Sequence, residues 1–136
     1  RGLVTEKELE CVNSAKIAKM CASPLGKRMA QAQRKDQLFR EQQFVMELPA
    51  GDVNSRWNSE EYILVQGIID AYFMEEDEIV LVDYKTDRVK RGQEQKLIDL
   101  YHVQLEDYAR ALERMTGKKV KEKIIYSFTL QKEILL

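Results

Sequence analysis

Two aspartates and one lysine in the middle of the chain combine in a way that suits phosphodiester hydrolysis. Asp70 follows one apolar segment, and Asp83 and Lys85 follow another, Ile79–Val82. On a strand, residues two apart point to the same face, so Asp83 and Lys85 would share one. Carboxylates are suitable ligands for Mg²⁺, and an adjacent ammonium could orient or deprotonate a metal-bound water. The combination is compatible with metal-assisted hydrolysis, although an Asp–Lys pair at the end of a strand is more commonly only a surface ion pair.

The segments around these residues have the patterns of strands that would hold them in place. An alternating or continuous apolar pattern predicts three strands, over residues 39–48, 62–73 and 79–84. The third is apolar enough to be buried on both faces, as a central strand is. We expect the four acids at 75–78 to form a solvated hairpin tip.

Helices are predicted on both sides of these strands in the sequence. Residues 5–36 have helical periodicity with a new start at Ser23, which is suited to be an N-cap. Residues 92–115 fit one long helix ending near Gly117, and 121–130 fit a last strand. A helix between the third and fourth strands permits a crossover within one mixed sheet. The pattern thus predicts an α/β fold with helices covering the sheet.

The composition excludes several classes of protein. The 136 residues are enough for one domain, and a net charge of -1 gives no overall attraction to nucleic acid or membrane. No segment approaches the roughly 20 apolar residues of a membrane span. Cys11 and Cys21 are too few ligands for a zinc site, so buried free thiols are expected. Trp57, in a polar loop, could be a lid or, more commonly, a plug over the core.

Three motifs, in this order, resemble those of RecB-family nucleases in the PD-(D/E)XK, restriction-endonuclease-like superfamily. They are Gly67-x-x-Asp70, Asp83-Tyr84-Lys85-Thr86 and Gln104-x-x-x-Tyr108. From about Phe39 onward the chain is also similar to the C-terminal nuclease domain of AddA-type helicase–nucleases. The resemblance implies a restriction-endonuclease-like mixed β-sheet flanked by helices. It also implies that residues 1–136 are a single nuclease domain from the C-terminal part of a larger helicase–nuclease.

The resemblance further implies a role for each matching residue. Asp70 and Asp83 would bind Mg²⁺ together with the main-chain carbonyl of Tyr84, and Mn²⁺ or Ca²⁺ could substitute in binding. Lys85 would be the catalytic lysine, and Arg88 belongs to a basic segment that the DNA strand would follow.

Three further residues have supporting roles implied by the family, each with a structural alternative. Gln104 and Tyr108 are four apart on a helix and share a face, so they would line the DNA groove or brace the site. A polar pair closing a helix–sheet interface would look the same. Glu41 matches an acid that precedes this site in the family, or it is a solvated glutamate on an edge strand.

The chain departs from the family in one respect. A histidine ligand usually comes from a helix near the start of the nuclease domain, and here no histidine precedes Asp70. His102 lies within the long helix, where a solvated or packing role is expected. The iron–sulfur cluster of some relatives cannot form with these cysteines.

The expected function is that of a metal-dependent DNA exonuclease domain. It would act in double-strand break repair and recombination in the cytoplasm, away from any membrane, and its partners would be DNA and an AddB-like subunit. The alternatives are a catalytically incomplete DNA-binding or partner-docking module, and an unrelated metal-independent α/β domain. A phosphate-binding Gly-rich loop is absent from the sequence, so no ATPase is expected in this chain.

Overall fold

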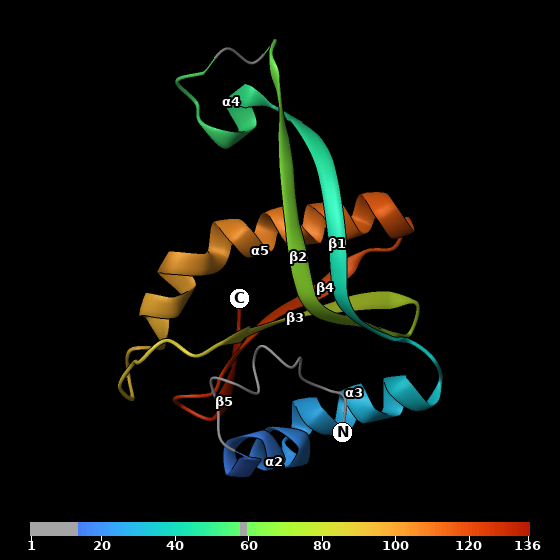
Figure 1. Cartoon of the computed structure of the whole chain (residues 1–136), viewed down its shortest axis with the longest axis vertical. Coiled ribbons are helices and arrows are strands. Elements are labelled where there is room, and N and C mark those ends of the chain that lie inside the picture. The colour runs from blue at the N-terminus through green and yellow to red at the C-terminus, as the bar shows by residue number, and fades with distance from the viewer. Residues whose placement is uncertain (1–13, 58–59) are drawn as a thin grey trace.

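The computed structural model describes residues 14–57 and 60–136, which form a sheet between two layers of helices (Figure 1). Its elements are α2 (Ser14–Ala22), α3 (Pro24–Arg34), β1 (Leu38–Pro49), α4 (Ala50–Val53), β2 (Tyr62–Glu75), β3 (Glu78–Lys85), α5 (Glu94–Thr116), β4 (Val120–Ser127) and β5 (Lys132–Leu135).

The five strands form one mixed sheet in the order β1-β2-β3-β4-β5. All neighbours are antiparallel except β3 and β4, which are parallel and joined by the crossover helix α5. This confirms the predicted α/β fold with a mixed, restriction-endonuclease-like sheet flanked by helices. It also confirms β3 as the central strand, since every residue from Ile79 to Tyr84 is buried.

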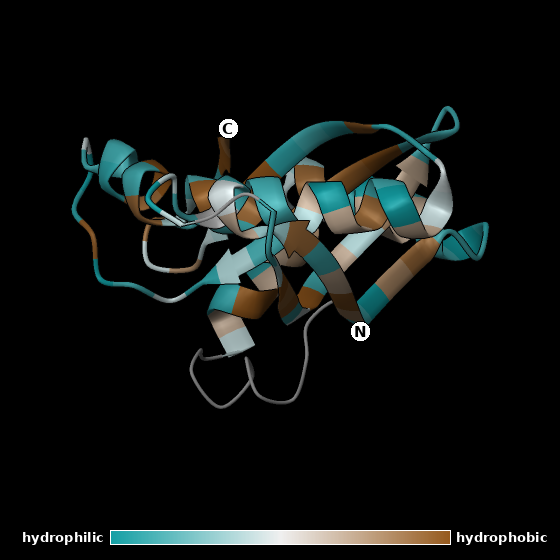
Figure 2. Cartoon of the chain, turned by 90° about the horizontal axis from the view of Figure 1, so that it is seen from above, coloured by the Kyte–Doolittle hydropathy of each residue, from teal (hydrophilic) through white to brown (hydrophobic). Residues whose placement is uncertain are grey.

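Two apolar cores lie on opposite faces of the sheet, one against α2 and α3 and one against α5 (Figure 1). Alternate residues of β3 divide between them: Val80 and Val82 face α3, and Ile79 and Leu81 face α5. Hydrophobic and hydrophilic residues alternate along the helices in Figure 2, as expected for elements that cover a sheet on one side. Continuing this alternation places the side chains of Asp83 and Lys85 on the α5 face.

β1 and β2 continue beyond the sheet as a two-stranded arm. They pair from Leu38↔Phe73 to Pro49↔Tyr62, whereas β2 and β3 pair only as far as Ala71↔Val82. Figure 1 shows the arm rising away from β3, with α4 near its tip. The predicted half-buried face of β1 is confirmed, because Phe44, Met46 and Leu48 are buried. The short helix α4 was not expected from the polar composition of its loop.

Ser23 separates α2 from α3 as the sequence predicts. Its hydroxyl accepts the N–H of Gly26 at 3.1 Å, and Pro24 occupies the first helical position. Leu25 and Met29 of α3 are buried in the core. The cap therefore fixes where α3 begins, and with it which face of the helix meets the sheet.

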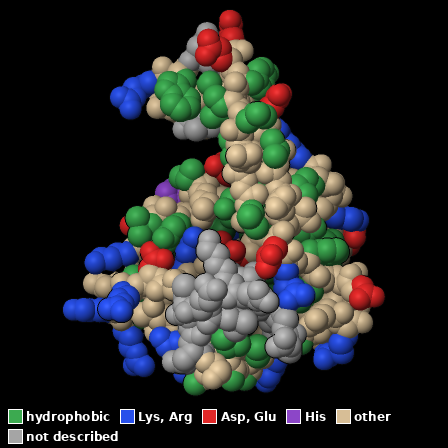
Figure 3. Space-filling model, in the orientation of Figure 1, with side chains coloured by type: hydrophobic (Ala, Val, Ile, Leu, Met, Phe, Trp, Pro, Cys, Tyr) green, Lys and Arg blue, Asp and Glu red, His purple; other side chains and the backbone are tan. Residues whose placement is uncertain are grey.

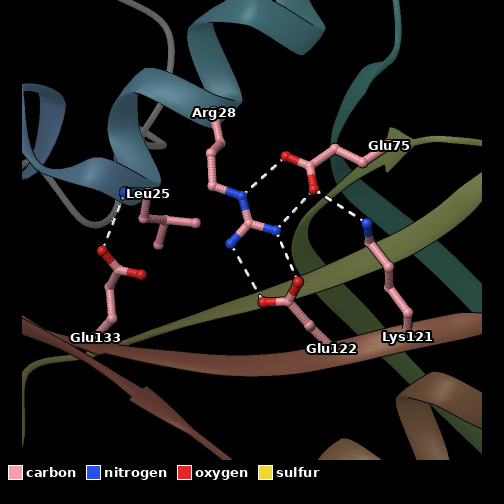
Figure 4. A network of polar contacts seen from close by, with 6 residues as sticks. All are labelled: Leu25, Arg28, Glu75, Lys121, Glu122 and Glu133. Atoms are coloured by element: carbon pink, nitrogen blue, oxygen red, sulfur yellow. Dashed lines mark hydrogen bonds and ion pairs between the residues drawn. The ribbon is translucent and has the colours of Figure 1, made fainter.

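A charged network attaches α3 to β2 and β4 (Figure 4). The predicted solvated hairpin tip at 75–78 is confirmed at Glu76 and Asp77, whereas Glu75 belongs to this network. The guanidinium of Arg28 contacts the carboxylates of Glu75 and Glu122 at 2.8 Å, and Lys121 contacts Glu75 at 3.2 Å. The hydrogen bond from Arg28 lowers the pKa of Glu75 to about 2, and the two carboxylates raise the pKa of Arg28. Only Glu76 and Asp77 of the four acids are exposed.

Several other sequence expectations need correction. Trp57 is 49% exposed, so it is not a plug over the core. The predicted last strand over 121–130 is β4 followed by a turn, and β5 was not predicted.

Cys21 is a free, half-buried thiol, whereas Cys11 lies outside the described residues. Within the part of the chain that the structure describes, no helix has the length and apolar character needed to cross a bilayer.

Candidate active site

Asp70 and Asp83 lie side by side where β2 leaves the sheet. The last β2–β3 pair is Ala71↔Val82, and the two aspartates occupy the next position on each strand. A carboxylate oxygen of Asp70, Oδ2, accepts the main-chain N–H of Tyr84 at 2.9 Å. The hydrogen bond holds the Asp70 carboxylate against the end of β3, beside the segment that carries Asp83 and Lys85.

Asp83 is a buried acid, 3% exposed, that faces the Lys85 ammonium across 2.9 Å. The contact is an ion pair without hydrogen-bond geometry, and Asp83 Oδ2 receives no hydrogen bond from the described residues. A buried carboxylate oxygen with its lone pairs unused is costly unless a cation compensates it. The Lys85 ammonium supplies such a cation at this oxygen.

The Lys85 ammonium has three close partners. It lies 2.9 Å from Asp83 and donates a hydrogen bond to Gln104 Oε1 at 3.2 Å. It also lies 3.9 Å from the ring centroid of Tyr101, within the range of a cation–π interaction. The Tyr101 hydroxyl donates to Asp87 at 2.7 Å, and that bond raises the phenol pKa to about 12. The lysine is thus held by one strand neighbour and two residues of α5.

Tyr108 joins α5 to the arm beside the two aspartates. Its ring meets that of Phe44 edge to face, with centroids 5.3 Å apart. A Cβ built on Gly67 would lie 3.2 Å from the Tyr108 ring, so the absence of a side chain there allows the ring to approach β2. Burial raises the pKa of Tyr108, and the charges of Asp83 and Asp70 raise it further. The ring contact with Phe44 thus ties α5 to the arm beside Gly67, three residues before Asp70.

Glu41 and Arg88 are the two predicted site residues that the structure leaves at the surface. Glu41 is exposed and has a φ of 52°, at the one position between Arg40↔Ala71 and Gln42↔Ile69 where the β1–β2 ladder is interrupted. By register it lies opposite Asp70, so the acids of β1, β2 and β3 occupy successive positions across three strands. Arg88 is exposed in the loop after β3, and His102 is exposed on α5.

The donor set fits part of a divalent-metal site. Two carboxylates from neighbouring strands converge, and one has a buried oxygen that accepts no hydrogen bond from the described residues. Hard oxygen ligands of this kind suit Mg²⁺, which commonly takes only one or two protein carboxylates. Across residues 14–57 and 60–136, no group of three His, Cys, Asp or Glu side chains is close enough to hold a metal. The two aspartates could therefore supply only part of such a site.

Comparison with known proteins identifies the family. The model of the PD-(D/E)XK nuclease superfamily matches residues 6–134. The chain belongs to the PD-(D/E)XK nuclease superfamily. The predicted resemblance is thus confirmed at the level of the family, over nearly the whole chain.

Two curated relatives of this PD-(D/E)XK chain are each named as one subunit of an ATP-dependent helicase/nuclease. The protein from Alkaliphilus metalliredigens is 46% identical and that from Clostridium novyi 44% identical, each over 98% of this chain. The chain spans only 11% of the length of either relative. The crystal structure of SSO0001 aligns with this chain with a TM-score of 0.49 at 15% identity, covering 96% of this chain and 59% of that one.

Tyr101 and Asp87 are residues of this candidate site that the sequence alone did not indicate. Tyr101 lies three residues before Gln104 on α5, so helical spacing alone places both on one face. That signal was available, but it did not show which side chain the face would meet. The contact with Lys85 arises from the crossover, because α5 passes over the end of β3.

The arm of this nuclease-superfamily chain stands apart from the rest of its surface (Figure 3). Figure 3 shows the arm standing away from the rest of the molecule, with an open space between its tip and the body. Lys and Arg side chains project from the lower part of the same view. Lys85 keeps 17% of its side chain exposed, so the candidate site is open to solvent at this residue.

Proposed function

We propose that this chain is a metal-dependent DNA nuclease domain of a helicase–nuclease. The observation that carries the proposal is the buried Asp83–Lys85 ion pair beside Asp70 at the strand ends. Membership of the PD-(D/E)XK superfamily supports nuclease chemistry, and nucleases of this superfamily generally use divalent metal ions. In the proposed site Asp70, Asp83 and the main-chain carbonyl of Tyr84 would hold Mg²⁺, with Mn²⁺ or Ca²⁺ able to substitute in binding.

A bound divalent ion would supply positive charge to the phosphate being attacked. The chain's own residues would place and complement that charge. Lys85 presents an ammonium that would stabilise negative charge developing on the phosphate oxygens. Gln104 accepts a hydrogen bond from this ammonium and so restricts the orientation of the Lys85 side chain. Tyr108 has a raised phenol pKa, so its hydroxyl stays protonated and would act as a hydrogen-bond donor near the carboxylates.

The surrounding protein is proposed from the relatives' name. That name describes an ATP-dependent nuclease coupled to a helicase, and its wording as one subunit of the enzyme implies a second chain. We therefore propose that the substrate is DNA and that the enzyme cuts it as an exonuclease. The cleavage would serve double-strand break repair and recombination in the cytoplasm. An AddB-like chain would be the partner. Exposed Arg88 and Glu41 would lie at the edge of the DNA path, Arg88 contacting phosphates.

Replacing the buried acid in the full-length protein tests this function. Asp83→Ala should lower the rate of cleavage of linear duplex DNA with Mg²⁺ by at least about 10²-fold, a typical loss when a preorganised charge is removed. Asp99→Ala is the matched control, because Asp99 is an exposed aspartate on α5. Cleavage by Asp83→Ala at the wild-type rate would refute the assignment.

A catalytically incomplete DNA-binding module is the second candidate. One observation favours it: among the described residues, no three His, Cys, Asp or Glu side chains lie close enough together to hold a metal ion. Thermal unfolding with Ca²⁺ or Mn²⁺ separates the two candidates. Under the nuclease proposal, metal at 100 times its Kd should stabilise the wild type by about 2.7 kcal/mol and leave Asp83→Asn unchanged. Equal melting temperatures with and without metal, combined with salt-sensitive DNA binding, would favour the module.

A further inference from the structure

Tyr101 presents the face of its ring to the Lys85 ammonium, which is the group proposed above to stabilise the reacting phosphate. The distance from Nζ to the ring centroid is 3.9 Å. The ring quadrupole attracts a cation at this position, and the attraction grows where water is excluded. Lys85 is 17% exposed, so part of its hydration is already replaced by protein.

The Tyr101 ring is itself fixed in place. Its hydroxyl donates to Asp87 Oδ2 at 2.7 Å, and Asp87 lies two residues after Lys85. The segment that carries Asp87 is tied down in turn, because the Thr129 hydroxyl donates to the Asp87 carbonyl at 2.7 Å. The Tyr101 side chain and the loop after β3 therefore stabilise each other's positions.

The three neighbours of the ammonium differ in what they contribute. Asp83 supplies opposite charge at 2.9 Å, and Gln104 supplies one acceptor at 3.2 Å. The ammonium could keep its contacts with Asp83 and Gln104 even if it moved closer to the Asp83 carboxylate. The Tyr101 ring places an aromatic face, which accepts no strong hydrogen bond, 3.9 Å from Nζ. It therefore restricts where the ammonium lies without using its remaining donor capacity.

We propose that Tyr101 is a positioning residue that holds the Lys85 ammonium by a cation–π interaction, in the orientation needed for phosphodiester cleavage. This inference rests on the proposed nuclease function. It assigns to the ring face a role distinct from that of the hydroxyl, which anchors the ring through Asp87. Because Tyr101 acts through Lys85, its effect falls on the rate of cleavage and not on DNA affinity.

A series from phenylalanine to its fluorinated analogues, all of which lack the hydroxyl that bonds Asp87, tests the ring face with little change in ring size. In the full-length protein, position 101 would receive Phe, 4-fluoro-Phe, 3,5-difluoro-Phe and 3,4,5-trifluoro-Phe. Each fluorine withdraws electron density from the ring face and weakens cation binding. We expect the single-turnover cleavage rate to fall stepwise along the series, by about 2-fold to 30-fold in total, the range of a cation–π contact. DNA affinity should stay constant.

Two controls separate the cation–π contact from general packing. The same fluorinated series at Tyr62, a 65% exposed residue at the start of β2, should leave the rate unchanged. Tyr101→Trp keeps an aromatic face and should retain more activity than Tyr101→Leu. Equal rates across the series at position 101 would overturn the inference while leaving the nuclease function intact. No cleavage by the wild-type protein would overturn both.

Discussion

Glu75→Gln should destabilise the protein at neutral pH, and the loss should fade as the pH falls. Glu75 receives charge-assisted hydrogen bonds from Arg28 at 2.8 Å and pairs with Lys121, and its pKa is lowered to about 2 from its ordinary value of 4.5. A shift of this size corresponds to about 3.4 kcal/mol. The side chain is 29% exposed, so solvent screening reduces the expected loss to about 1–2 kcal/mol.

The sign of the pH dependence follows from the lowered pKa. A carboxylate with a depressed folded-state pKa contributes its full stabilisation above the unfolded pKa, here 4.5, and loses it as the pH falls toward 2. By pH 3 the difference between wild type and Glu75→Gln should shrink to less than half of its value at pH 7. Above about pH 6 the difference should be constant.

Urea unfolding followed by circular dichroism measures both quantities. Free energies of unfolding would be determined at pH 7 and at pH 3 for wild type, Glu75→Gln and a matched control. Glu76→Gln is that control, because it changes the same functional group at the adjacent, exposed position. Equal losses for the two variants at pH 7, or a Glu75→Gln loss that persists unchanged at pH 3, would refute the network's role.

Two glycine substitutions test the close contacts around the helices. Gly67→Ala would place a Cβ 3.1–3.2 Å from the interlocked rings of Phe44 and Tyr108, and should cost about 1–3 kcal/mol in urea unfolding. A variant as stable as wild type would show that the rings move aside freely. Gly26→Ala would press a Cβ against the Met20 carbonyl oxygen, well inside van der Waals contact, and should lower stability by about 3 kcal/mol or more. An unchanged melting temperature in calorimetry would contradict the tight corner between α2 and α3.

Much of the fold was accessible from local patterns. The apolar run of β3 predicted its central position, and the three–four spacing of residues 92–115 predicted α5, because both patterns record burial against a neighbour. β5 was missed because its four residues, Lys132–Leu135, are identified as a strand only by pairing with β4. Glu75 was misjudged because its partner Arg28 lies 47 residues away in sequence. Local charge density gives no sign of so distant a partner.

In the candidate site, too, local spacing was predictable and contacts between distant segments were not. The two-residue spacing of Asp83 and Lys85 was enough to predict that they share a face, and the structure brings their charged atoms within 2.9 Å. That Gln104 and Tyr101 meet Lys85 depends on where α5 crosses the sheet, which periodicity does not specify. The roles of Asp70, Asp83, Lys85 and Tyr84 in metal binding and catalysis stay predictions, and the Asp83 variants test that of Asp83.

The parallel pairing of β3 with β4 has a consequence for the order of folding. β1, β2 and β3 are antiparallel neighbours in sequence order, so their pairing closes short loops. β4 reaches β3 only after the whole of α5 has crossed over, as in Ile79↔Val120. Closing so long a loop is entropically costly, and non-local contacts of this kind slow folding. Since Gln104 and Tyr101 reach Lys85 only through this crossover, the proposed capacity to cut DNA would be acquired late, after the meander has formed.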